Sequence, residues 1–122
     1  MTFPPQTDPF KMRKNLLKFN FEKAKDLFNH AIGLLNNGNV VDSLRNLKKV
    51  MKLCPIFPNL YFALASVYAH AGDLLEAKKA CQKEIILNPQ NKMAMQFYQK
   101  ISQTIEQSRR IAELISARKR DL

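Results

Sequence analysis

Residues 36–55, NNGNVVDSLRNLKKVMKLCP, align with residues 70–89, HAGDLLEAKKACQKEIILNP, at a constant offset of 34 residues. Residues identical at this offset include the pairs Ala31 and Ala65, Gly38 and Gly72, Leu53 and Leu87, and Pro55 and Pro89. A fixed period of this length is typical of stacked repeats, in which each supersecondary unit buries its apolar face against a neighbour. The sequence therefore predicts a small helical solenoid.

Helix-start and helix-stop residues divide the chain into segments. Asp8 and Pro9 suit an N-cap and a first helical position, whereas Pro55 and Pro89 each end a helix. Within the repeats we expect helices over 21–36, 40–53 and 60–70. The expected organisation is a disordered tail (1–8), a short N-terminal helix (9–20), two repeats (24–57 and 58–91), a long C-terminal helix (92–118) and a tail (119–122).

The turn inside each repeat carries its own chemistry. Gly38 and Gly72 occupy the turn position at which a residue adopts a positive φ, which glycine does at no steric cost. Asn39 and Asp73 follow as N-caps of the next helix. Glu76, three residues after Asp73, completes the pattern of a capping box, in which its side chain reaches back to the cap N–H.

Residues at particular repeat positions resemble the tetratricopeptide repeat. The second copy matches the signature most fully, with Tyr61, Leu64, Ala65, Tyr68, Ala77 and Pro89 at its spacings. The first copy has Leu27, His30, Ala31, Leu34, Ser43 and Pro55 at the same places and lacks the aromatic residues. The resemblance covers residues 24–91. It implies an all-α fold with two helix-turn-helix repeats, which the flanking N-terminal and C-terminal helices cap.

The resemblance also implies a function, since tetratricopeptide repeats bind partners in a concave groove. We expect a non-catalytic adaptor or scaffold whose groove takes an extended or helical hydrophobic segment of a partner protein. The implied groove residues are Phe28, Asn29, Ile32, Asn59, Phe62, Ala63, Ser66, Met93 and Phe97. The simpler alternative for the three Phe residues is that they belong to the hydrophobic core.

Net charge offers a second functional hypothesis. Twenty Lys and Arg against ten Asp and Glu give a formal charge of +10. Some of these cations recur at the repeat period and predict a basic stripe, formed by Arg45, Lys48, Lys49, Lys52, Lys79 and Lys83. Such a stripe suits RNA, DNA or an acidic protein partner. The alternative is an ordinary solvated helix face, because Lys is a good helix former.

Composition limits the remaining classes. A chain of 122 residues with 46% hydrophobic residues is expected to form one small domain. Neither a secretory signal nor a transmembrane segment is present, so we expect a soluble, cytoplasmic protein. Cys54 and Cys81 lack metal-ligand spacing and are expected to be reduced. The sequence has no nucleophile motif or phosphate loop to accompany His30 and His70. We therefore expect a protein that has no catalytic activity and binds no metal or cofactor.

The C-terminal helix carries a heptad-type apolar seam. Its members follow one another in steps of four and three: Ala94, Tyr98, Ile101, Ile105, Ser108, Ala112 and Ile115. Two repeats lie below the usual minimum of about three for independent stability. Self-association through this helix is therefore one hypothesis, and folding of the seam back onto the core is the alternative.

Overall fold

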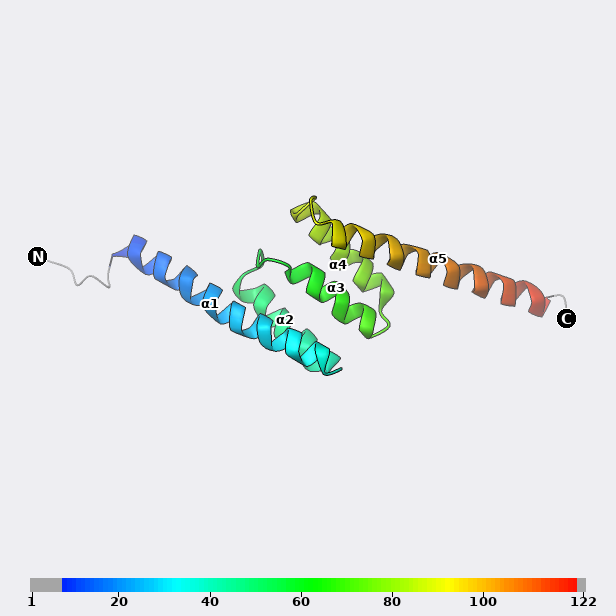
Figure 1. The fold of residues 1–122 in the computed structure, drawn as a ribbon, viewed down its shortest axis with the longest axis horizontal. Coiled ribbons are helices and arrows are strands. Elements are labelled where there is room, and N and C mark those ends of the chain that lie inside the picture. Colours follow the sequence, from blue (N-terminus) through cyan, green and yellow to red (C-terminus); the bar gives the residue numbers. More distant parts are fainter. Residues whose placement is uncertain (1–7, 121–122) are drawn as a thin grey trace, which may run out of the picture. The chain divides into compact units, whose positions relative to one another are not determined.

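The computed structural model describes residues 8–120, which form an all-helical fold (Figure 1). The helices are α1 (Pro9–Asn36), α2 (Val40–Leu53), α3 (Leu60–His70), α4 (Leu74–Leu87) and α5 (Lys92–Arg120). The chain divides into two compact units, Met1–Leu60 and Tyr61–Leu122. The bounds of α2 and α3 confirm the expected helices over 40–53 and 60–70.

Unit 1 is an antiparallel hairpin in which α2 packs against the second half of α1 (Figure 1). Ala31 on α1 and Leu47 on α2 are fully buried. The buried Ser43 hydroxyl donates to the Ala31 carbonyl at 2.7 Å, which ties the two helices together and satisfies a polar group inside the core. Small residues at 31 and 43 thus allow the two backbones to approach closely.

An aromatic cluster of Phe21, Phe28 and Phe57 closes the open end of this hairpin. The Phe57 ring centroid lies 5.4 Å from that of Phe21 and 5.0 Å from that of Phe28. Phe57 follows α2 in the chain and is buried, so the segment after α2 folds back onto α1. Tilted rings at these separations add to the stabilisation from burial alone.

The expected end of the N-terminal helix near Asn20 is wrong. A single helix of 28 residues runs from Pro9 to Asn36, capped by Asp8, whose side chain accepts from the Phe10 N–H at 3.0 Å. No Gly or Pro interrupts the sequence between Pro9 and Ile32, and one Asn costs a helix only tenths of a kcal/mol. Asp8 therefore belongs to the helix cap rather than to a tail, and the remaining expected tail residues, 1–7, lie outside the described residues.

The two turns repeat one hydrogen-bond pattern at the 34-residue offset. The Asn39 N–H donates to Leu34 O at 2.8 Å, and the Asp73 N–H donates to Tyr68 O at 2.9 Å. Gly38 and Gly72 have φ values of 81° and 82°, which confirms their expected left-handed conformation. The helix ends match too, because Cys54 N–H donates to Val50 O at 2.8 Å and Asn88 N–H to Glu84 O at 2.7 Å. The sequence period is thus a period of backbone structure.

The helix caps repeat in the same way, with one departure from expectation. Asn39 and Asp73 accept from the backbone N–H three residues on, at 3.3 Å and 3.2 Å. Glu76, however, does not complete a capping box, because the Asp73 N–H is already bonded to Tyr68 O. The Glu76 carboxylate instead pairs with Lys79 at 3.2 Å.

Glycine substitutions should separate conformational from steric effects at these turns. We expect Gly38→Ala and Gly72→Ala each to lower the free energy of unfolding by about 1 kcal/mol, because a Cβ meets no atom within 4 Å and only the positive φ is penalised. Gly33→Ala lies within α1, also in open space, and should raise stability by up to about 1 kcal/mol. Urea unfolding measures all three, and equal signs at positions 33 and 38 would contradict the explanation.

Unit 2 consists of α3, α4 and α5, with α5 packed against α4. The buried face of α4 contains Ala77, Ala80 and Cys81, and α5 contributes Ala94 and Ile101. The second half of α5 extends beyond α4, and its side chains are exposed (Figure 1). The helix ends at Arg120 rather than 118, so Lys119 and Arg120 are helical and not part of a tail. Cations in a last turn complement the helix dipole, which favours this extension.

Candidate functional site: an apolar cleft between α3 and α5

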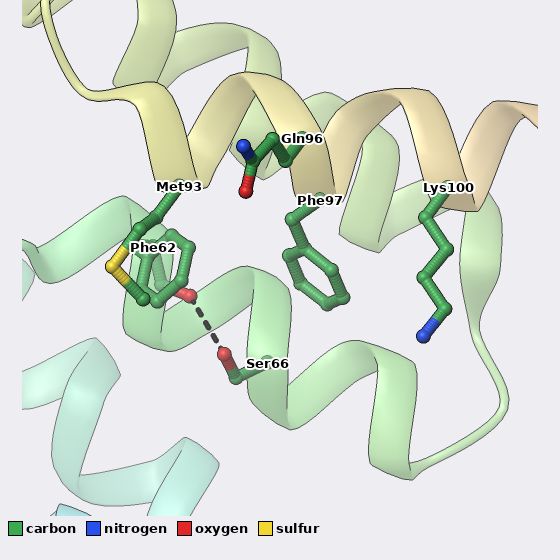
Figure 2. A pocket seen from close by; sticks show the side chains of 6 residues that line it. All are labelled: Phe62, Ser66, Met93, Gln96, Phe97 and Lys100. Atoms are coloured by element: carbon green, nitrogen blue, oxygen red, sulfur yellow. Dashed lines mark hydrogen bonds between the residues drawn. The ribbon is translucent and has the colours of Figure 1, made fainter.

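An open cleft of about 280 Å³ lies between α3 and α5 in unit 2 (Figure 2). It is lined by Phe62 and Ser66 from α3 and by Met93, Gln96, Phe97 and Lys100 from α5. Figure 2 shows the Phe62, Met93 and Phe97 side chains directed into the space between the two helices. The lining is therefore largely apolar, with polar side chains from Gln96 and Lys100 at its edge.

Helical spacing brings these six residues together. Phe62 and Ser66 are four apart, so they share one face of α3. Met93, Phe97 and Lys100 follow at intervals of four and three on the facing side of α5. The Phe62 and Phe97 rings meet across the cleft, with centroids 5.9 Å apart and planes tilted by 59°. This aromatic pair forms a preorganised hydrophobic floor.

The Ser66 hydroxyl does not add a free donor to the cleft. It donates to the Phe62 carbonyl of its own helix at 3.1 Å, as Figure 2 shows. Its remaining polar capacity is that of an acceptor. Recognition in this cleft must therefore come mainly from shape and apolar contact, with the exposed Lys100 ammonium as its cation.

A buried polar network sets the start of α5 and hence the position of Met93 and Phe97. The Glu84 side chain, only 4% exposed, accepts from Asn91 Nδ2 at 3.1 Å. Asn91 Oδ1 in turn accepts from the Ala94 N–H at 3.1 Å, which caps the first turn of α5. A buried carboxylate with a polar partner thus joins the end of α4 to the beginning of α5.

The structure brings together four of the nine expected groove residues: Phe62, Ser66, Met93 and Phe97. Ala63, also on α3, is buried and only 5% exposed. Asn59 precedes α3 with a φ of 63°, a conformation that Asn tolerates better than most residues, and its side chain is exposed. It does not line this cleft.

The three expected groove residues on α1 lie in unit 1. Phe28 packs against Phe57 and is half-buried, so it takes part in the aromatic cluster. Asn29 is exposed and Ile32 is half-buried. For Phe28, the alternative of a packing role therefore has direct structural support.

Sequence reasoning missed two residues of the cleft, Gln96 and Lys100. Both lie on the same face of α5 as Met93 and Phe97, at offsets of three and seven from Met93. Extending the face of α5 by this spacing would have found them. The repeat positions that drew attention to Met93 and Phe97 end before Lys100, which explains the omission.

The basic stripe residues are all exposed. Arg45, Lys48, Lys49 and Lys52 lie on α2 in unit 1, and Lys79 and Lys83 lie on α4 in unit 2. Arg45 pairs with Asp42 at 3.3 Å and Lys79 with Glu76 at 3.2 Å. Exposed pairs of this type contribute little stability, yet they partly neutralise the stripe.

Lys83 has a different environment, since its ammonium lies 5.4 Å from the centre of the Tyr61 ring. The same two residues, with Ile86 and Leu87, line a smaller hollow of about 210 Å³ between α3 and α4. This cation–π contact engages Lys83 within unit 2. Three of the six stripe cations thus have a partner on their own or a neighbouring helix.

Two side chains in unit 2 have raised pKa values. Burial raises the pKa of the Cys81 thiol to about 11, and the nearby Glu84 carboxylate adds to the shift. The pKa of the Tyr68 hydroxyl is raised by burial and then by the Glu76 and Asp73 carboxylates. Both groups are therefore neutral at physiological pH, and the fully buried Cys81 thiol is a poor nucleophile in this state.

We expect Cys81 to react slowly with iodoacetamide in the native protein. At pH 9 an ordinary thiol is about half ionised, whereas one with a pKa of about 11 is about one per cent ionised. Alkylation should therefore slow at least about fiftyfold relative to urea-unfolded protein, because the side chain is also fully buried. The native rate should keep rising with pH towards 11. Mass spectrometry of the Cys81 peptide gives both rates, and equal native and unfolded rates at pH 9 would contradict the shift.

Comparisons of the chain with protein-family models, with curated proteins and with solved structures found no match. Between residues 8 and 120, no three His, Cys, Asp or Glu side chains are grouped so that they could hold a metal ion. None of the helices described over that range has the length and apolar character required to cross a bilayer.

Proposed function

We propose that this chain is a non-catalytic protein-interaction module of the tetratricopeptide-repeat type, which binds a hydrophobic segment of a partner protein in the cleft between α3 and α5. The observation that carries the proposal is the cleft itself, whose floor consists of the Phe62 and Phe97 rings. Aromatic and Met side chains are enriched at the centres of protein interfaces. An aliphatic or aromatic anchor of the partner packs onto this floor, beside Met93.

The repeated hydrogen-bond pattern supports the resemblance to tetratricopeptide repeats. Equivalent bonds recur at the 34-residue period at both turns, both caps and both helix ends. At the 34-residue offset, Phe28, Asn29 and Ile32 of unit 1 are equivalent to Phe62, Ala63 and Ser66 of unit 2.

The chemistry of the cleft edge narrows the partner. Lys100 is exposed beside an apolar floor, and the six lining residues include no carboxylate. A partner segment with an apolar anchor and a nearby Asp, Glu or C-terminal carboxylate matches this arrangement. The basic stripe has less support as the main binding surface, because half of its cations already have local partners.

A peptide selection on the full chain tests the proposal. We expect peptides selected from a random displayed library to share an apolar anchor next to an acidic residue, and Met93→Asp to weaken their binding at least tenfold. Met93 is 66% exposed near the N-terminus of α5, where an acidic residue is compatible with the helix, so the change leaves the fold intact.

Met95 supplies the matched control. It is also exposed and lies on α5 two residues further on, outside the cleft, so Met95→Asp should leave binding within about twofold. Equal losses for both variants would contradict binding in the cleft. Binding that falls steeply with salt and disappears in a Lys48→Glu/Lys49→Glu variant would instead indicate a charge-driven site.

A further inference from the structure

The first twelve residues of α1, residues 9–20, form an N-terminal arm with an unusual surface. Five large apolar side chains on it have exposed fractions between 53% and 82%: Phe10, Met12, Leu16, Leu17 and Phe19. The arm extends beyond the end of α2 within unit 1 (Figure 1), and contacts of the aromatic cluster begin only at Phe21. Folding of unit 1 therefore leaves this apolar surface in water.

The same arm carries a concentrated positive charge. Its cations are Lys11, Arg13, Lys14 and Lys18, and no Asp or Glu occurs between Asp8 and Glu22. Elsewhere in the chain, cations on α2, α4 and α5 are accompanied by acids on their own helix, as in the pairs of Arg45 with Asp42 and Arg109 with Glu106. Residues 43–53 of α2 also carry four cations and no acid, but Leu47 and Val50 in that segment are fully buried, whereas the apolar residues of the arm are exposed.

Charge and apolar side chains are separated around the helix. At about 100° per residue, Lys11, Lys14 and Lys18 fall within a sector of about 60°, while the five apolar residues span an arc of about 180° on the other side. Arg13 lies within that arc, and its long side chain can keep the guanidinium in water while the stem lies along apolar surface. The arm is thus a cationic amphipathic helix with an exposed apolar face.

We propose that the N-terminal arm binds the surface of an anionic lipid bilayer, lying in the interface with Phe10, Leu16 and Leu17 inserted among the acyl chains. A helix with Lys on one face and Phe and Leu on the other has the composition of interfacial helices. Anionic headgroups attract the Lys side chains, and the wide apolar arc needs no complementary pocket in a bilayer.

Other occupants fit the same observations less well. A second copy of the arm brings four cations and no acid, and the whole chain has a charge of +10, so pairing of two arms is opposed by repulsion. Nucleic acid phosphates would neutralise the cations yet leave Phe10 and Leu17 exposed to water. Of these occupants, the anionic bilayer alone supplies both negative charge and an apolar medium.

A single-tryptophan experiment tests the proposal on the full chain, which contains no Trp. We expect the fluorescence of Phe10→Trp to shift to the blue with vesicles of phosphatidylcholine and phosphatidylserine (7:3, roughly), and to stay unchanged with phosphatidylcholine alone. Leu114→Trp, on α5 at 70% exposure against 82% for Phe10, is the control and should not shift. Unchanged Phe10→Trp fluorescence with anionic vesicles would overturn the proposal.

Vesicle co-sedimentation separates the arm from the rest of the charge. Neutralising the arm as Lys11→Gln/Lys14→Gln/Lys18→Gln should weaken binding about a hundredfold, and Leu16→Ser/Leu17→Ser should weaken it at least tenfold. Lys48→Gln/Lys49→Gln/Lys52→Gln removes the same charge from α2 and should change binding less than threefold. An equal loss for the α2 variant would overturn the proposal, and so would full binding by Leu16→Ser/Leu17→Ser. Tighter arm-dependent binding to duplex DNA or RNA than to vesicles would also overturn it.

Discussion

Replacing Phe57 by alanine is expected to lower the free energy of unfolding of unit 1 by about 3–5 kcal/mol. The Phe57 ring is 8% exposed and lies between the rings of Phe21 and Phe28, at centroid distances of 5.4 Å and 5.0 Å. The substitution removes buried area, both ring–ring contacts and the link between the end of α2 and the middle of α1. Urea unfolding followed by circular dichroism measures the loss.

Phe10 is the control for this substitution, because it carries the same side chain on α1 and is 82% exposed. Phe10→Ala should change the free energy of unfolding by no more than about 0.5 kcal/mol. A Phe57→Ala effect as small as that would mean that the aromatic cluster does not hold the hairpin together. Additive losses in the pair Phe21→Ala and Phe57→Ala would likewise contradict a direct interaction between these rings.

Local signals predicted the helices and turns well because each acts over a few residues. Gly38 and Gly72 take the positive φ that ends a helix, and Asn39 and Asp73 cap the next one. The ion pairs of Arg45 with Asp42 and of Lys79 with Glu76 are also equivalent at the 34-residue offset. Each of these features involves residues only a few positions apart, so the local sequence is enough to predict it.

The length of α1 could not be predicted from the same signals. The expected boundary near Asn20 came from the start of the repeat pattern, whereas a helix ends only where a residue breaks it or where packing ends it. Nothing between Phe19 and Glu22 does so, and α1 continues through the position. The capping box failed for a related reason, since Tyr68 O already accepts the N–H that Glu76 was expected to bind.

The candidate site was predicted only in part, because it depends both on repeat positions in the sequence and on the path of α5 in space. Repeat position identified Phe62 and Met93, which line the cleft. The position of an aromatic residue in a repeat does not decide whether it lines a cleft or packs in a core. Phe28 packs against Phe57 in the aromatic cluster of unit 1, whereas Phe62 packs against Phe97 beside the open cleft. The open space beside the second pair arises from the path of α5, which no local pattern encodes.

The apolar seam of α5 continues beyond the residues that pack. Ala94 and Ile101 are buried and Ile105 is half-buried, whereas Ser108, Ala112 and Ile115 are exposed. The reason is length, because α4 has 14 residues and α5 has 29, about 21 Å against about 44 Å. The first half of the seam thus packs within unit 2. Self-association through the second half stays a prediction.

Two isoleucines of that seam should therefore respond very differently to the same substitution. Ile101→Ala is expected to lower the free energy of unfolding of unit 2 by about 2–5 kcal/mol, because Ile101 is 3% exposed and its removal leaves a cavity. Ile115→Ala, at 52% exposure on the same helix, should cost at most about 0.5 kcal/mol in a monomer. If α5 instead pairs with a second copy, the Ile115→Ala loss will grow with protein concentration, since dimer stability depends on mass action. Thermal unfolding at protein concentrations a hundredfold apart distinguishes the two cases, and Ile101→Ala should show the same loss at both.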